Sequence, residues 1–523
     1  MQENKKQRWW VPLQYGLILI VGIALGVFIK GNISIKSLVG GSKSPIEEMM
    51  QIVNERYVDS VNVDSLTIRV ANYYLAGLDP HSVYIPPTEL TEVNEQLTSN
   101  YRGIGIEFQQ YRDSFYVSYV IKEGPAAKAG LQLGDILLKV DDSILLSGQK
   151  VEAETIRKKI KGPLGSQVKI TFLRAGQIKS VQIARDNVPT SSVDASYMIN
   201  DTVGYIKINR FADRTYESFM QALEPLIKKG MKSMVLDLRG NGGGLLSEAV
   251  AIADELLPGD RLIVYTEGLH SPKMSYNTKR EGLFETGKLS ILMDESSASA
   301  SEVLAGALQD WDRATIIGRT SFGKGLVQQQ FTLSNGGAFR LTTAKYYTPL
   351  GRNIQRSYAK GKMEYEHAFM NRMTEDAKGI VDATVKGKPY KTPKGHIVYG
   401  GGGIYPDKWI PGAVIHVDTN YRLLWEDNFI NDFTFTWYLQ HQNELNKYKD
   451  VPSYLKGMAN WDVWASLLQV ASPSQKQLLL KLTANKVEIK NQVLAMIARS
   501  KWYKVGYYQV VNTLDPHFTD MMP

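Results

Sequence analysis

The chain has 523 residues, 43% of them hydrophobic and 22% charged, and its 61 basic and 53 acidic residues give a net charge of +8. This is a globular composition over a length that exceeds one core, and it excludes a coiled-coil rod, a collagen-like chain and a largely disordered protein. The absence of cysteine excludes disulfides, thiolate metal sites and a cysteine nucleophile. The small charge excess forms no Lys/Arg stripe, so we expect no nucleic-acid partner.

The N-terminus resembles a membrane anchor. A basic segment, residues 1–10, precedes an uncharged apolar run at 11–29, close to the ~20 residues that span a bilayer as a helix. Basic residues before such a run favour a cytoplasmic N-terminus. We therefore predict that residues 1–30 form a cytoplasmic tip and a single, uncleaved span in the inner membrane, with the rest in the periplasm or outside. A cleaved signal peptide is the alternative, although no Ala-x-Ala-like site follows the run.

Helical spacing of apolar residues predicts short helices between 43 and 95, within an N-terminal helical region that we place at 31–98. The stretch Leu78-Asp79-Pro80-His81-Ser82 reads as a turn inside this region. A lone histidine in a loop is more often structural than catalytic, and we expect His81 to be structural.

Residues 99–188 are strand-rich, with one predicted helix at 152–161. They contain Gly103-Ile104-Gly105-Ile106, then Gly124–Leu131 and Leu133–Leu137. This set resembles a PDZ domain. The resemblance implies that backbone N–H groups of Gly103, Ile104, Gly105 and Ile106 hold a peptide's terminal carboxylate while the peptide adds a strand beside them.

Residues 203–350 alternate apolar strands with helical patterns, which predicts a layered α/β core. The predicted strands are 203–208, 233–238, 289–293 and 314–317, and the predicted helices are 215–229, 246–257 and 299–310. From about residue 410 the chain becomes helical and rich in tryptophan, which indicates packing or oligomer contacts.

Ser299 lies at the start of one of these predicted helices. Backbone N–H groups and the helix dipole favour the oxyanion that forms when such a serine attacks a carbonyl. With Glu302 three residues later, the same serine also reads as a capping box. Lys324 follows the next strand and could serve as the base, provided that burial lowers its pKa.

Five motifs together resemble the C-terminal processing serine proteases. In chain order they are Asp237-Leu-Arg-Gly-Asn-Gly-Gly-Gly244, Ser297-Ala-Ser299-Ala-Ser-Glu302, Ala305-Gly-Ala-Leu-Gln-Asp310, Thr320-Ser-Phe-Gly-Lys324-Gly-Leu-Val-Gln328 and Gly400-Gly-Gly-Gly-Ile-Tyr-Pro-Asp407. The resemblance covers roughly residues 40–410 and implies a protease core, which we place at 189–410, with some of its elements supplied by the N-terminal region. The 411–523 helical region lies outside it.

The resemblance assigns roles by position. Ser299 would be the nucleophile, Lys324 its general base and Gln328 the residue that orients the lysine. The backbone N–H groups of Ala300 and of a glycine in the 242–244 turn, Gly244 being preferred, would form the oxyanion hole. No metal or organic cofactor is implied, and the partners would be protein substrates with apolar C-termini.

The predicted fold is therefore a multidomain α+β chain: transmembrane helix, short helical segment, β-rich PDZ domain, layered α/β protease core and C-terminal helical extension. Two other functions stay open. One is a membrane-tethered PDZ scaffold with an inactive core. The other is an acyl transferase on cell-wall peptides built on Ser321-x-x-Lys324, although its companion motifs are missing. Assembly through the helical termini and delivery of substrates by an adaptor protein are also left open.

Overall fold

The computed structural model describes residues 44–111, 114–141, 143–144, 151–377, 387–412 and 418–523. The chain divides into two compact units, residues 1–71 and residues 72–523. The membrane span predicted at 11–29 lies outside the described residues. None of the helices in the described ranges is long and apolar enough to cross a bilayer.

The helices predicted between residues 43 and 95 are confirmed. They are α2 (Pro45–Arg56), α3 (Val63–Ala76) and α4 (Pro87–Glu95). Helix α2 begins at a capping box in which the Ser44 hydroxyl accepts the Glu47 N–H and the Glu47 carboxylate accepts the Ser44 N–H. This arrangement satisfies donors that the first turn of a helix otherwise leaves without partners.

A six-stranded sheet forms the centre of the second unit, and the layered α/β prediction is confirmed. Its strands, in spatial order, are β10 (Val193–Met198), β11 (Val203–Ile208), β12 (Ser233–Asp237), β15 (Lys288–Met293), β16 (Thr315–Gly318) and β21 (Lys408–Trp409). All neighbours from β11 to β21 are parallel, while β10 is antiparallel to β11. The helices that alternate with these strands are α7 (Thr215–Lys228), α8 (Leu246–Asp254) and α9 (Ala300–Asp310).

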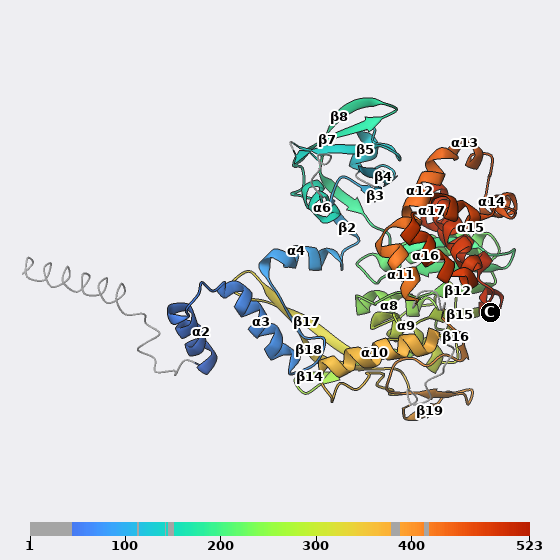
Figure 1. The fold of residues 1–523 in the computed structure, drawn as a ribbon. Helices are drawn as coiled ribbons and strands as arrows, with labels where there is room; N and C mark the ends of the chain where they lie inside the picture. The colour runs from blue at the N-terminus through green and yellow to red at the C-terminus, as the bar shows by residue number, and fades with distance from the viewer. Residues whose placement is uncertain (1–43, 112–113, 142, 145–150, 378–386, 413–417) are drawn as a thin grey trace, which may run out of the picture. The chain divides into compact units, whose positions relative to one another are not determined.

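This arrangement decides where chemistry can occur. Strands β12, β15 and β16 lie side by side and run in the same direction (Figure 1). The glycine-rich turn follows β12, the loop to Ser299 follows β15, and the loop to Lys324 follows β16. Because carboxyl ends of neighbouring parallel strands meet at one sheet edge, the three motifs emerge there together.

A second sheet, not predicted as a unit, carries Gln328. Its strands are β1 (Val83–Ile85), β13 (Leu262–Gly268), β14 (Ser271–Asn277), β17 (Leu326–Thr332) and β18 (Ala338–Tyr347). The long strand β18 pairs with β1, β13 and β17, all antiparallel. The N-terminal strand β1 thus belongs to a sheet that is otherwise built from residues 262–347.

The strand-rich segment folds around its own core, which includes Ile104, Phe115, Ile156 and Ile170. Its sheet has the order β3 (Ile106–Tyr111), β4 (Ser114–Val120), β5 (Ile136–Val140), β7 (Gln167–Arg174), β8 (Gln177–Ala184), with β6 (Ser143–Ile144) on β5. Two helices, α5 (Pro125–Lys128) and α6 (Ala153–Ile160), accompany it, and β2 (Asn100–Gly103) pairs with β9 (Asp186–Pro189). Strand β3 is therefore an edge strand.

The remaining described elements lie toward the C-terminus. Helix α10 (Lys362–Ala377) and the hairpin β19 (Pro389–Lys391) with β20 (Ile397–Tyr399) follow the second sheet. The predicted helical extension is confirmed as α11 (Thr419–Glu426), α12 (Phe429–Gln440), α13 (Gln442–Leu445), α14 (Val451–Met458), α15 (Val463–Val470), α16 (Pro473–Lys481) and α17 (Lys486–Leu514). These helices share a separate core against which Trp425, Trp437, Trp461 and Trp464 pack. The tryptophans are therefore packing residues.

Candidate active site

Ser299 occupies a strained position at the N-cap of α9. Its backbone φ is 55° and ψ is −113°, a conformation that costs a non-glycine residue of the order of 1–3 kcal/mol. The Glu302 carboxylate accepts the Ser299 N–H at 2.7 Å, as in a capping box. The Glu302 N–H donates to the Ser299 carbonyl at 2.9 Å, so it does not require the serine hydroxyl as its acceptor. Strain of this kind is concentrated at functional sites.

Glu302 contacts the backbones of both Ser299 and Lys324, whereas the sequence indicated it only as the capping-box partner of Ser299. It is fully buried, and its carboxylate accepts the Ser299 and Lys324 N–H groups on one oxygen, at 2.7 and 2.9 Å. The other oxygen accepts the Gly323 N–H at 2.7 Å and the Ser321 hydroxyl. Burial raises the pKa of the Glu302 carboxyl, and these hydrogen bonds oppose the rise.

A second residue holds the same two backbones together. The hydroxyl of Tyr346, which is 2% exposed, lies 3.2 Å from the Ser299 carbonyl oxygen and 2.6 Å from that of Lys324. Glu302 on the N–H side and Tyr346 on the carbonyl side therefore bring the predicted nucleophile and base to one place. Within the described residues, no hydrogen bond joins the Ser299 hydroxyl directly to Lys324 Nζ.

Lys324 has the environment that a general base requires. Burial lowers the pKa of its ammonium group, and the positive charge of Arg340 lowers it further, while Glu302 and Asp79 act in the opposite direction. Its Nζ donates to Gln328 Oε1 at 2.9 Å, as the predicted orienting role requires. The Gln328 Nε2 in turn donates to the backbone carbonyl of His81 at 2.6 Å.

The imidazole of His81 contacts Tyr365. Its Nε2 lies 3.2 Å from the Tyr365 hydroxyl, and the two rings meet edge to face. Burial lowers the pKa of His81 to about 4, with a further contribution from the charge of Lys324, so the ring is neutral near pH 7. These contacts are those of a structural side chain.

The glycine turn after β12 packs directly against Ser299. A Cβ added to Gly243, whose φ is +92°, would lie 2.8 Å from the Ser299 Cβ, so only glycine permits this approach. The Gly243 N–H donates to Asn241 Oδ1 at 2.9 Å. Among the described residues, no acceptor is recorded for the N–H of Gly244 or of Ala300, the two groups predicted to form the oxyanion hole.

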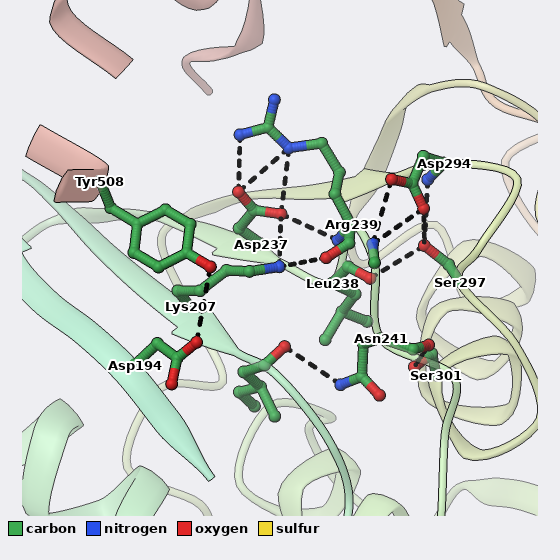
Figure 2. Close-up of polar contacts among 12 residues, drawn as sticks. Asp194, Lys207, Asp237, Leu238, Arg239, Asn241, Asp294, Ser297, Ser301 and Tyr508 are labelled. Carbon is green, nitrogen blue, oxygen red and sulfur yellow. Dashed lines mark hydrogen bonds and ion pairs between the residues drawn. The ribbon is translucent and has the colours of Figure 1, made fainter. Parts of the chain in front are cut away.

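Figure 2 shows how this turn is fastened to the serine loop. Ser301 Oγ donates to the Asn241 carbonyl and Ser297 Oγ to the Leu238 carbonyl, each at 2.9 Å. The Gly240 N–H donates to Asp294 at 2.9 Å. Two of the serines around Ser299 therefore serve structure.

At the start of the turn, Asp237 is 1% exposed and pairs with Lys207 and Arg239 (Figure 2). Burial opposes ionisation of this carboxyl, but the two cations outweigh burial and hold the pKa of Asp237 well below its usual range. The C-terminal helix α17 reaches this network through Asn512, 3.4 Å from the Arg239 guanidinium.

Ser321, the alternative nucleophile of a Ser-x-x-Lys pair, is fully buried. Its hydroxyl donates to Glu302 and accepts the Ile404 N–H at 2.7 Å. It fastens the Gly400–Asp407 signature to the lysine loop and has no exposed surface from which to attack a substrate.

Of the four predicted tail-binding residues, Ile106 lines a cavity of about 530 Å³, while Ile104 is fully buried. Gly103 ends β2, Ile104 and Gly105 form the connecting loop, and Ile106 begins the edge strand β3. The side chains that line the cavity include Tyr101, Ile106, Phe108, Arg157 and Ile160. Most of the other lining side chains are polar or charged, Glu95, Glu107 and Lys161 among them. The edge strand β3 supplies the geometry that β-strand addition requires.

Comparisons with known proteins find matches for both the strand-rich segment and the α/β core. Residues 202–363 match the family described as Peptidase family S41, and residues 103–184 match the PDZ domain family. The chain is 33% identical over 317 residues to a carboxy-terminal-processing protease of Bartonella bacilliformis, covering 59% of this chain and 71% of that relative. It is 32% identical over 364 residues to a probable CtpA-like serine protease of Staphylococcus saprophyticus, covering 68% and 73%.

Among solved structures, a photosystem II D1 C-terminal processing protease is 27% identical and covers 59% of this chain and 89% of that one, with a TM-score of 0.34. A score this low adds nothing about how the parts of this chain are arranged.

Proposed function

Because this chain belongs to peptidase family S41 and is a serine-type peptidase of the carboxy-terminal-processing kind, we propose that it cleaves exported proteins through a Ser299–Lys324 dyad. The observation that carries this proposal is the shared Glu302 oxygen, which accepts the N–H groups of both residues. The lowered pKa of Lys324 and the donors at Gly244 and Ala300 supply the rest of the chemistry.

In the acylation step, neutral Lys324 removes the Ser299 proton as Oγ attacks the scissile carbonyl carbon. The negative charge that develops on the carbonyl oxygen is stabilised by the N–H groups of Ala300 and Gly244. The tetrahedral intermediate then collapses: the C–N bond breaks, and the lysine ammonium returns the proton to the leaving amine. An ester between Ser299 and the acyl half of the substrate remains.

Deacylation uses the same groups, with water as the nucleophile. Lys324, again neutral, removes a proton from water, which attacks the ester carbonyl; the bond from the carbonyl carbon to Ser299 Oγ then breaks, the lysine ammonium returns the proton to Oγ, and the new carboxyl terminus is released. Gln328 Oε1 accepts one amine hydrogen of Lys324, so it holds the lysine and leaves the nitrogen lone pair free to accept the proton that is transferred.

The PDZ domain would recruit substrates by their C-termini. An apolar tail would lie along β3 with its carboxylate at the Gly103–Ile106 loop and its terminal side chain in the adjoining cavity.

We further propose that residues 11–29 anchor the chain in the inner membrane, with the catalytic part outside the cytoplasm. Peptide mapping of the mature protein tests the anchor, and a mature N-terminus after residue 29 would overturn it.

The proposed activity is tested by cleavage of a protein with an apolar C-terminus by the full chain. Ser299→Ala should abolish cleavage. Ser296→Ala, a change of the same kind in the same loop, should leave it unaltered. Membrane and envelope proteins that accumulate in cells carrying Ser299→Ala would identify the substrates by mass spectrometry. Unimpaired cleavage by Ser299→Ala would remove the proposed function.

A further inference from the structure

The orientation of Gln328 depends on a main-chain group far away in the sequence. An amide side chain presents either its oxygen or its NH₂ to a neighbour, and only the oxygen can accept a hydrogen from Lys324. The His81 carbonyl accepts from Gln328 Nε2 at 2.6 Å and thereby turns Oε1 toward Lys324 Nζ, 2.9 Å away. The placement of one carbonyl oxygen thus fixes which face of Gln328 meets the lysine.

That carbonyl is held by a turn built on Asp79, which is 5% exposed. Asp79 Oδ1 accepts the N–H groups of His81 and Ser82, at 2.8 and 2.9 Å, and its Oδ2 accepts the Ser82 hydroxyl at 2.6 Å. An aspartate that accepts the N–H groups two and three residues ahead fixes a tight turn.

The turn is also fastened to the sheet at the position that matters. Ser82 Oγ accepts the Thr342 N–H at 3.1 Å, and Thr342 on β18 is the register partner of Gln328 on β17. The register pair Gln328–Thr342 therefore joins both parts: Gln328 is one member, and Thr342 anchors the turn whose carbonyl orients Gln328. The His81 ring points to Tyr365, so the contribution of His81 to Gln328 is made by the main chain.

We propose that Asp79 is a positioning residue for the catalytic base: it builds the turn that aims the His81 carbonyl at Gln328, which then presents its oxygen to Lys324. The inference rests on the proposed function, because the role of Lys324 as base belongs to that proposal. It assigns a chemical task to the Leu78–Ser82 turn, which the motif-based assignment left without one.

Asp79 also acts on Lys324 through its charge. The charged and titratable groups that face the lysine are Glu302 from α9, Arg340 from β18, and Asp79 and His81 from the turn. The negative charge of Asp79 raises the pKa of Lys324, so its removal should lower that pKa and favour the neutral amine. A residue that merely stabilised the fold would not shift the pH profile in this direction.

The test is a double-mutant cycle in the full chain with kcat and KM measured separately. Asp79→Ala and Gln328→Ala should each lower kcat about tenfold or more, with a smaller change in KM, because each removes the same hydrogen-bonded support of the lysine. Since both residues act through one chain of contacts, the kcat of the double variant should be only slightly below that of the less active single variant. Losses that multiply would overturn the proposal, as would full activity of Asp79→Ala.

Asp79→Asn keeps a side-chain oxygen for the two N–H groups and removes the charge. It should recover part of the activity lost in Asp79→Ala and move the lysine-dependent limb of the kcat profile to lower pH. Asp418→Asn is the matched control, because Asp418 accepts the N–H groups of Asn420 and Tyr421 in the same way at the start of α11. It should change neither quantity.

The outcomes separate the two proposals. An inactive wild-type chain, or an active Ser299→Ala variant, removes the proposed function. If wild type cleaves, Ser299→Ala does not, and the Asp79 and Gln328 losses are independent, only the positioning role fails. Should Asp79→Ala not fold, as judged by thermal unfolding, Asp79→Asn decides: wild-type kinetics with an unshifted profile would refute the role of Asp79.

Discussion

The backbone N–H groups of Ser299 and Lys324 donate to the same oxygen atom of Glu302, at 2.7 and 2.9 Å. The nucleophile and the base lie on loops that follow different strands, so their relative position depends on a common acceptor. Glu302 supplies it from the first turn of the helix that Ser299 begins.

Glu302→Gln should therefore damage both stability and catalysis. The carboxylate accepts four hydrogen bonds, and an amide replaces one of its acceptor oxygens by a donor. Each buried donor left without a partner costs about 1–3 kcal/mol, and denaturant unfolding should show a loss of that order together with a fall in kcat. Glu217→Gln, which alters an exposed pair with Arg214, should leave the stability and kcat almost unchanged. Wild-type kcat in Glu302→Gln would show that the carboxylate does not align the dyad.

The pH dependence of cleavage should report Lys324. Only the neutral amine accepts the serine proton, so kcat/KM should rise with pH through the pKa of Lys324, which burial and then Arg340 lower from its ordinary value. Arg340→Gln removes the second of these influences and should shift the rising limb to higher pH. A shift to lower pH, or none, would mean that another group limits the rate.

Ser301→Ala tests the fastening of the glycine turn. The Ser301 hydroxyl is fully buried and donates to the Asn241 carbonyl at 2.9 Å. That carbonyl also accepts the Ala298 N–H at 3.0 Å, so loss of the hydroxyl should cost about 0.5–1.5 kcal/mol of unfolding free energy. The nucleophile is intact in this variant, so Ser299-dependent cleavage should persist. Complete loss of cleavage in a folded Ser301→Ala protein would mean that Ser301 takes part in the chemistry.

The sequence was informative wherever chemistry or periodicity is local. Strands β11, β12, β15 and β16 and helices α7, α8 and α9 follow from apolar periodicity, and the family resemblance carried by the motifs is confirmed by the S41 and PDZ matches. The β13–β14 hairpin and helix α10 were not predicted. Strand β14 is mostly exposed and has no apolar pattern, and the short apolar run of β13, which includes the buried Ile263 and Val264, does not by itself distinguish a strand from a buried helix.

The sequence predicted the residues proposed for catalysis, but not the groups that hold them in place. Glu302 was visible only as a partner in a capping box, since its bonds to Gly323 and Lys324 join segments that the sequence separates. The His81 carbonyl could not be found by inspecting side chains, because its contribution to Gln328 is made by the main chain. Asn512 on α17 meets Arg239 through tertiary packing alone.

Tail recognition is tested with one peptide prepared as free acid and as amide. A carboxylate at the Gly103–Ile106 loop would make charge-assisted bonds that an amide cannot reproduce, each worth roughly 1.5–3 kcal/mol. Loss of one or two should reduce kcat/KM by about 10- to 100-fold or more. Equal kcat/KM for the two forms would show that the PDZ domain does not select free tails.

The central claim is that Ser299 and Lys324 act as one catalytic unit. The most direct measurement is kcat for cleavage of a single peptide by wild type, Ser299→Ala, Lys324→Ala and the double variant, all shown to be folded by thermal unfolding. Since nucleophile and base serve the same step, each single change should abolish cleavage to the same residual level, and the double variant should be no lower. Substantial cleavage by Ser299→Ala, or losses that multiply in the double variant, would contradict the account.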